Sequence, residues 1–506
     1  MRRRLSPSAA RSSGPGRSSG PARRGRWRTR VGRVVRLVRL GGRRMVHLAV
    51  VKVRGIGADE ARRRALDERF AIRSAADVAA ELGQLKGVLM KAGQLLGVIA
   101  DGLPPEAAAA LATLQADVPP MAPSLAAGVV RAELGSSPER LFLDWQPVPV
   151  AAASIGQVHR AVLFDGREVA VKVQYPGVAE TIGPDLDNAE LLYRLFSSFA
   201  LKGFDARAFV EELRARMTEE LDYRREAADQ QAFARAFAGH PFVRVPDVVP
   251  ERSGVRVLTT EWVEGWTFAE LVAHADPATR QRAAEAVWRF GQRCVLQLGM
   301  FNGDPHPGNY RFHPDGTVSF LDFGLVKRWD PGEWDLLRPS LDAIVVSRDP
   351  GALVATMEHN GFLRAGHGLD PQLVYDYVSS PYVPYLTDSF TFTPSFVPDT
   401  LRRLLDRGGP HAGVMAALDM PASFVILDRV VWGVSALLGR LGATGPWRAM
   451  LLEYLTGGPP AGHWGVTEQR WPAPPGTEWV TPGPVGQTDP RPAAGAGPIK
   501  EAPWPT

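Results

Sequence analysis

The spacing of apolar residues predicts helices in several parts of the chain. In residues 75–100, apolar side chains recur at three- to seven-residue intervals, which is typical of one buried helix face (Leu82, Leu85, Leu89, Leu96 and Ile99). Glycines interrupt this face and indicate that another element packs closely on it (Gly83, Gly87, Gly93 and Gly97). Further helices are predicted over residues 205–238, 278–300 and most of 330–456.

Apolar and polar residues alternate in other segments, and this alternation predicts strands. The predicted strands cover residues 148–154, 157–163, 167–174, 256–262, 310–312 and 318–321. Asp165-Gly166 and Pro314-Asp315-Gly316 lie between successive strands and predict hairpin turns. Strand alternation also places Ala170 and Lys172 on the same face of their strand.

These patterns predict a chain of helices and strands with four regions. They are a basic arm (1–58), a helical segment (59–140), a long mixed body of helices and strands (141–456) and a tail (457–506). The tail is rich in Pro and Gly and has no apolar periodicity, so we expect it to be unstructured.

Charge is distributed unevenly along the chain. The formal net charge is +5, yet residues 1–58 contain 16 Arg, one Lys and no acidic residue. The remainder has 42 basic and 54 acidic residues, a balance of −12. Such an arm could meet an anionic membrane or nucleic acid, but the Ser, Gly, Pro and Arg of residues 1–30 favour disorder or an over-extended start codon. No specific nucleic-acid partner is expected.

No apolar run approaches the ~18 residues of a spanning helix, and no signal peptide is predicted. The best candidate, residues 430–439, is bounded by Arg429 and Arg440. We therefore expect a cytoplasmic protein, with peripheral contact at the inner membrane face as an open alternative. The single cysteine, Cys294, excludes an internal disulfide and is predicted to be a buried core thiol.

Four residues have the order and spacing of a phosphoryl-transfer site. Such a site needs a cation on the phosphates, oxygen ligands for Mg²⁺ and an acid that positions the acceptor. Lys172 ends the segment Val-Ala-Val-Lys. Asp304 and Asn309 are five residues apart, and Asp322 begins Asp-Phe-Gly thirteen residues later. The order predicts Lys172 on the phosphates, Asn309 and Asp322 on Mg²⁺, and Asp304 as the base or positioning group.

Each of these residues taken singly has a plainer interpretation. A lysine at the end of an apolar strand is commonly a solvated edge residue, and either aspartate could cap a turn. Turn caps do not account for the joint spacing of Asp304, Asn309 and Asp322. His306 has no second His or Cys at ligand spacing, so it is predicted to position the loop.

Two more motifs give residues 75–330 a resemblance to the UbiB/AarF group of atypical kinases. Lys91-Ala92-Gly93-Gln94 is similar to the family's Lys-x-Gly-Gln motif. A second segment resembles the Ala-rich loop that replaces the usual Gly-rich loop over the phosphates (Ala151, Ala152, Ala153 and Ser154). The resemblance implies an α+β, protein-kinase-like bilobal fold. Its small β-rich N-lobe (141–265) and helical C-lobe (266–456) would follow a family-specific helical extension (59–140).

The resemblance also assigns roles to three acidic residues. Glu226 would pair with Lys172, while Glu220 and Asp222 would meet Lys91 or the metal. On one continuous helix, Asp222 and Glu226 would share a face, and Glu220 would lie about 200° from Asp222. Such a helix would present carboxylates to two partners.

A hinge for adenine is implied at Glu261-Trp262-Val263, with Gly265 allowing close approach. The helix that carries Lys91 and Gln94 would lie over the site and block peptide substrates. Gly303 stands before Asp304 where protein kinases have Arg, and no clear Ala-Pro-Glu follows, so a protein substrate is not expected.

The predicted function is an Mg-ATP-dependent atypical kinase or ATPase that supports quinone or isoprenoid-lipid metabolism. ATP and Mg²⁺ are the implied cofactors, and a lipid or quinone precursor is the implied acceptor. One alternative is a nucleotide-binding pseudokinase scaffold. Another is a small-molecule phosphotransferase, because residues 303–309 also resemble the loop of choline and aminoglycoside kinases. The C-terminal helices, with Arg429 and Trp432, either bind membrane or complete the lower lobe.

Overall fold

The computed structural model describes residues 121–178 and 218–477, apart from 331, 365, 405 and 407. The chain divides into two compact units, 1–80 and 81–506, and all described residues belong to the second. The predicted basic arm and the helix over 75–100, with Lys91 and Gln94, lie outside the described residues.

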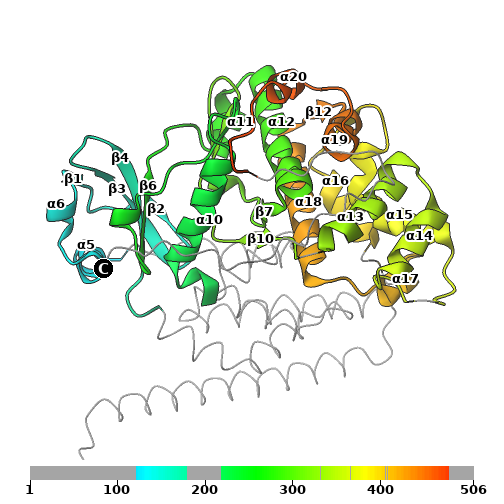
Figure 1. The fold of residues 1–506 in the computed structure, drawn as a ribbon, viewed down its shortest axis with the longest axis horizontal. Helices are drawn as coiled ribbons and strands as arrows, with labels where there is room; N and C mark the ends of the chain where they lie inside the picture. The colour runs from blue at the N-terminus through cyan, green and yellow to red at the C-terminus, as the bar shows by residue number, and fades with distance from the viewer. Residues whose placement is uncertain are drawn as a thin grey trace, which may run out of the picture. The chain divides into compact units, whose positions relative to one another are not determined.

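A five-stranded antiparallel sheet contains the predicted lysine strand (Figure 1). Its strands are β1 (Asp144–Trp145), β2 (Ala151–Ala152), β3 (Gly156–Val162), β4 (Glu168–Gln174) and β6 (Val257–Glu261). The order is β1-β3-β4-β6, with β2 also paired to β3. Gly166 adopts a φ of 88° in the β3–β4 turn, so the predicted hairpin is confirmed.

Helix α5 (Pro123–Leu134), followed by α6 (Pro138–Leu141), packs on one face of this sheet. Val129 and Val130 of α5 share a core with the alternate β4 residues Val169, Val171 and Val173. Burying a valine side chain contributes about 1.5–3 kcal/mol, so this shared face fixes the helix on the sheet. The predicted boundary at residue 140 therefore divides a single core. Residues 123–134 belong with the strands.

Helix α10 (Tyr223–Ala236) follows the break in the described chain. Residues 218–220 are helical, but the chain leaves the helix at Leu221 and Asp222. The Asp222 carboxylate accepts the backbone N–H of Arg224 and begins α10 as its N-cap. The prediction of one continuous helix over 205–238 was therefore wrong, because a capping aspartate ends one helical turn and starts another.

The rest of the described chain is mainly helical around one large core. Its elements are α11 (Phe268–His274), α12 (Pro277–Arg293), the π-helix η2 (Cys294–Leu298), α13 (Glu333–Leu341), the π-helix η4 (Asp342–Val346), α14 (Pro350–His359), α15 (Pro371–Val378), the 3₁₀ helix η5 (Ser380–Tyr385), α16 (Phe396–Leu404), α17 (Ala412–Ala417), α18 (Ala422–Leu441), α19 (Trp447–Thr456) and α20 (Gly465–Gln469). Helices α12 and α18 pack side by side (Figure 1). Cys294 is fully buried in this core, as predicted.

Two small sheets hold the predicted catalytic segments. One pairs β7 (Met300–Asn302) with β10 (Val326–Arg328), and the other has the order β5 (Val243–Arg244), β9 (Val318–Phe320), β8 (Tyr310–Phe312). The third short pair is β11 (Phe390–Thr391) with β12 (Thr444–Gly445), and the remaining 3₁₀ helices are η1 (Pro250–Arg252) and η3 (Pro307–Asn309). The loop after β7 carries Asp304, and the loop after β9 carries Asp322.

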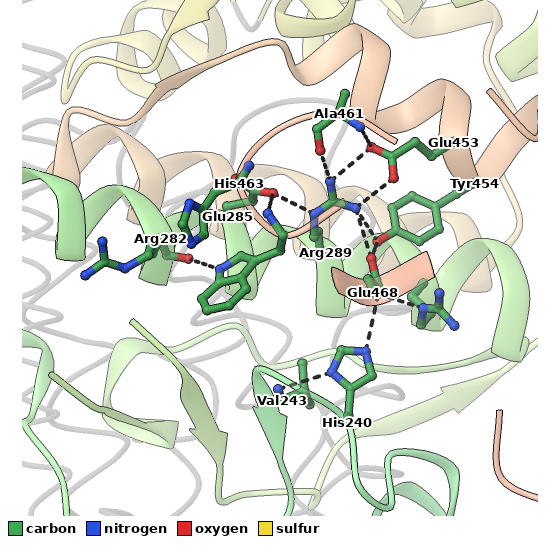
Figure 2. Close-up of polar contacts among 12 residues, drawn as sticks. His240, Val243, Arg282, Glu285, Arg289, Glu453, Tyr454, Ala461, His463 and Glu468 are labelled. Atoms are coloured by element: carbon green, nitrogen blue, oxygen red, sulfur yellow. Dashed lines mark hydrogen bonds and ion pairs between the residues drawn. The ribbon is translucent and has the colours of Figure 1, made fainter. Parts of the chain in front are cut away.

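The first part of the predicted tail is ordered, which corrects the expectation for residues 457–477. Its backbone N–H groups are accepted by buried carboxylates: Glu453 binds Ala461, and Glu285 binds His463 and Trp464 (Figure 2). Prolines stop helical continuation here, but side-chain acceptors from other elements satisfy the backbone. Across the described residues, no helix is both long and apolar enough to cross a membrane.

We call the charged group that anchors this segment the Arg289 cluster. It consists of Glu285, Arg289, Arg293, Glu453 and Glu468 (Figure 2). The Arg289 side chain is fully buried, and its guanidinium donates to all three carboxylates. The cluster therefore joins α12, α19 and α20.

Candidate functional site

Lys172 on β4 meets carboxylates from two distant parts of the chain. Its Nζ lies 2.7 and 2.9 Å from the two carboxylate oxygens of Glu226 on α10. The same Nζ lies 3.4 Å from Oδ2 of Asp322 and 5.0 Å from the ring centre of Tyr223. The two faces of β4 explain this placement, because the neighbouring valines point into the core under α5. The structure thus brings together the predicted lysine, glutamate and metal-ligand aspartate.

Burial and charge act in opposite directions on this group. Burial alone would lower the pKa of Lys172, but Asp322 and Glu226 outweigh it and raise that pKa well above its usual range. Burial raises the pKa of Glu226 to about 7, although Lys172 opposes the change. Lys172 therefore stays charged, and its partner titrates near neutral pH.

The alanine-rich segment lies beside a third carboxylate. Ala151 and Ala152 form β2, and the Ser154 hydroxyl donates to Oε2 of Glu220 at 2.8 Å. At the end of this loop, a Cβ on Gly156 would lie 2.3 Å from the Val173 carbonyl oxygen. Only glycine therefore allows the start of β3 to lie this close to the end of β4. The loop and the Glu220 carboxylate are thereby held together.

Asp222 does not join these carboxylates. Its side chain caps α10 and binds the Arg224 guanidinium, with Nη2 at 2.7 Å from Oδ2. Because the helix is interrupted at Leu221, the Asp222 side chain does not have the direction that one continuous helix would give it. We refer to Lys172, Glu220, Glu226 and Asp322 as the Lys172 cluster.

The loop around Asp304 is fixed by its own hydrogen bonds. Asn302 donates to the carbonyl of Asp322 at 2.6 Å and accepts the backbone N–H of Asp304 at 2.9 Å. Asn309 donates its side-chain amide to Oδ2 of Asp304 at 3.1 Å. His306 accepts the backbone N–H of Gly308, which is the positioning role predicted for it.

A residue far along the chain completes this loop. Arg429 on α18 donates to Oδ1 of Asp304 at 2.6 Å, and both side chains are nearly buried. Two glycines allow the contact: a Cβ on Gly303 would lie 2.9 Å from Ile426, and one on Gly433 would lie 2.4 Å from Pro305. Of the two roles left open for Arg429, completing the lower lobe is the one the contacts support.

Oxygen ligands for a divalent cation are available at Asp322 and Asn309. The hairpin joins them, because the Leu321 N–H donates to the Asn309 carbonyl at 2.9 Å. Asp322 is about one-third exposed, and the Asn309 amide nitrogen turns to Asp304, which leaves its oxygen for other partners. In the described part of the chain no three His, Cys, Asp or Glu side chains form a ready metal site. The donor set suits Mg²⁺, which commonly takes one or two protein ligands with phosphates and water.

The predicted hinge follows β6. The Glu261 side chain pairs with Arg244 at the surface, so its backbone would have to contact adenine. Val263 is nearly buried, and its N–H finds no hydrogen-bond acceptor within the described ranges. Gly265 has a φ of 147°, where a Cβ would meet the Phe312 carbonyl at 3.1 Å. The hinge therefore depends on glycine to approach β8.

Comparisons with known proteins agree with this geometry. Residues 113–356 match the family described as the ABC1 atypical kinase-like domain. The Synechocystis protein slr1919 is 32% identical over 310 residues, covering 60% of this chain and 54% of its own. The Arabidopsis thaliana chloroplastic protein ACTIVITY OF BC1 COMPLEX KINASE 1 is 34% identical over 288 residues, covering 56% and 42%.

A solved structure is also similar. The complex of Rv3197 with erythromycin from Mycobacterium tuberculosis aligns with a TM-score of 0.56 and 34% identity, covering 75% of this chain and 95% of that one. The chain spans about half the length of the curated relatives that it matches. Arg429 lies outside the residues matched to the family.

Proposed function

The chain belongs to the ABC1 atypical kinase-like family, the UbiB/AarF group, and on that premise we propose that it binds Mg-ATP and transfers or hydrolyses the γ-phosphate. One observation carries the proposal: Lys172, Glu226 and Asp322 come from three separate elements and meet within 3.4 Å. A strand lysine held by a helix glutamate, beside a metal-ligand aspartate, is the arrangement that positions ATP phosphates in kinase-like folds.

Each residue has a defined part in this reaction. Lys172 binds the α/β-phosphates, and Glu226 orients the ammonium group. Asn309, Asp322 and Glu220 supply oxygen ligands to Mg²⁺, which when bound neutralises charge on the phosphates. The backbone at Glu261 and Val263 receives adenine.

Asp304 positions the attacking hydroxyl group or water and accepts its proton. Its two oxygens bind Arg429 and Asn309, and each retains a lone pair for a further donor. The oxygen of a hydroxyl acceptor or of water attacks the γ-phosphorus while the bond to the β,γ-bridging oxygen breaks. ADP leaves, and the proton of the attacking hydroxyl passes to the Asp304 carboxylate. Arg429 holds that carboxylate in position.

We further propose that the acceptor is a lipid or a quinone precursor reached by peripheral contact with a membrane. This step rests on family membership and on the resemblance of Lys91 and Gln94 to the motif that blocks peptide substrates. A scaffold that binds nucleotide without turnover is the second candidate, because the carboxylate of Asp304 is already held on both oxygens.

The substitution Asp322→Asn tests the proposal. We expect ATP turnover to fall by about 10²–10³-fold, because an amide cannot neutralise the metal while the fold stays intact. Phosphate release should be measured with Mg-ATP, with and without anionic liposomes that carry an isoprenoid quinone precursor. Asp330→Asn is the matched control, since Asp330 is solvent-exposed and pairs only with nearby residues at the end of β10.

The outcomes separate the candidates. Turnover that Asp322→Asn leaves at the wild-type rate would falsify the assigned site. Nucleotide binding without product, in both the presence and the absence of lipid, would establish the scaffold. Transfer to a soluble amine or sugar alcohol would instead identify a small-molecule phosphotransferase.

A further inference from the structure

Arg311 occupies the middle of β8, two residues after the metal-ligand candidate Asn309. Its neighbours Tyr310 and Phe312 are buried in the large core at 4% and 0% exposure. Successive side chains of a strand point to opposite faces, so the Arg311 side chain leaves the face turned away from that core.

That face lies against the end of the hinge. A Cβ on Gly265 would lie 3.1 Å from the Arg311 Cβ. The backbones are fastened here, because Trp266 and Phe312 exchange two hydrogen bonds of 2.8 and 2.9 Å. Arg311 therefore lies between the segment proposed to receive adenine and the loop proposed to hold Mg²⁺.

The Arg311 guanidinium makes few polar contacts with the described residues. Its hydrogen bond is from Nη1 to the carbonyl of Tyr310 at 2.9 Å, and over the described residues it forms no ion pair. Two other arginines near the hinge differ, since Arg160 binds Glu168 and Arg244 binds Glu261. The acidic groups that act on Arg311, Glu264 and Glu270, form no ion pair with it in the described part of the chain. A half-buried guanidinium that forms no ion pair with the described residues keeps its flat face and most of its donors for a ligand.

We propose that Arg311 binds the base of the nucleotide, with its planar guanidinium stacked on the face of the ring. This inference rests on the proposed nucleotide site. Arg stacks on aromatic faces, and stacking accepts any base because every base has a π-face. Arg311 should therefore contribute to the binding of both ATP and GTP, and not to that of the triphosphate alone.

The test measures Kd for Mg²⁺ complexes of ATP, GTP and inorganic tripolyphosphate by calorimetric titration of the full chain. Arg311→Ala should weaken ATP and GTP by about 3–30-fold and change tripolyphosphate by less than about twofold. Arg311→Lys keeps the charge without the planar face, and should also weaken both nucleotides. Arg402→Ala is the control, because Arg402 is 71% exposed on α16.

Three results would overturn the proposal. They are unchanged nucleotide affinity in Arg311→Ala, an equal loss for tripolyphosphate, and full rescue by lysine, since the last two would assign Arg311 to the phosphates. A wild-type chain that binds none of the three ligands would instead refute the nucleotide site itself. Thermal unfolding of each variant checks that the fold is retained, and the lysine variant keeps the test available if the alanine variant does not fold.

Discussion

The Arg289 cluster and the Lys172 cluster both bury charge, but they satisfy it differently. Arg289 donates to Glu285, Glu453 and Glu468, and also to the Tyr454 hydroxyl and the Ala461 carbonyl. Lys172 donates to Glu226 and approaches Asp322, while the Glu220 carboxylate accepts the hydroxyl of Ser154. The Arg289 cluster uses a branched cation to close a network within the protein. In the Lys172 cluster, one ammonium faces the two carboxylates of Glu226 and Asp322, and Glu220 lies at the alanine-rich segment.

The difference supports the proposal that the Lys172 cluster, and not the Arg289 cluster, binds a ligand. Three carboxylates and one lysine leave a formal charge of −2, and Asp322 is about one-third exposed. An excess of carboxylate oxygen next to solvent favours a divalent cation. In the Arg289 cluster, two arginines face three carboxylates, and two of these, Glu285 and Glu453, also accept backbone N–H groups.

One glutamate from each cluster shows an opposite pKa shift, although the pKa of Glu453 in the Arg289 cluster is raised by burial as that of Glu226 is. Burial alone would raise the pKa of Glu468, but His240, Arg293 and Arg289 together lower it to about 2. Burial raises the pKa of Glu226 to about 7 despite Lys172. The Arg289 cluster therefore favours the ionised form of Glu468, whereas burial in the Lys172 cluster disfavours the ionised form of Glu226.

The largest effect is expected from removing Arg289, the central cation of the Arg289 cluster. Arg289→Met leaves three buried carboxylates without their shared partner and should cost about 3–5 kcal/mol in the free energy of unfolding. Urea unfolding measures this loss. Arg402→Met, at an exposed ion pair with Asp399, should cost less than about 1 kcal/mol. A similar small cost for Arg289→Met would show that the cluster does not hold residues 457–477 in place.

The next effect is a pH dependence with opposite signs in the two clusters. The pKa of Glu226 is raised from 4.5, so its stabilising contribution is present below 4.5 and is lost as pH rises through about 7. The pKa of Glu468 is lowered, so its contribution is present above 4.5 and is lost as pH falls toward 2. Glu226→Gln should therefore flatten the stability profile between pH 4.5 and 7, by on the order of 2 kcal/mol.

Thermal unfolding from pH 4 to 8 checks the Glu226 prediction. Glu251→Gln, at an exposed position of η1, is the control and should follow the wild-type profile. If the Glu226→Gln profile keeps the wild-type slope between pH 4.5 and 7, Glu226 does not change its charge in this range, and the prediction is wrong. Lys172, Asp322 and Glu220 act on Glu226, and Tyr223 interacts with it as well.

Sequence patterns predicted the Lys172 cluster better than the Arg289 cluster. Lys172 and Asp322 stand in short motifs, and strand alternation correctly assigned the face of Lys172. Arg429 and Glu468 have no such local signal, because they meet Asp304 and Arg289 across 125 and 179 residues. Pairing over that distance depends on helix packing in the core, which apolar periodicity does not specify. The order of residues 457–477 was missed for the same reason.

The smallest effect separates capping from metal binding at Asp222. The resemblance gave Asp222 a place beside Lys91 or the metal, whereas its carboxylate caps α10 and binds Arg224. Asp222→Ala should cost about 1 kcal/mol in unfolding free energy, as the loss of an N-cap does. Asp222→Ser restores a capping oxygen and should recover most of that stability. ATP turnover should change less than about tenfold in both variants, because the Lys172 cluster stays complete. A 100-fold loss of turnover in the stable Ser variant would place Asp222 on the metal after all.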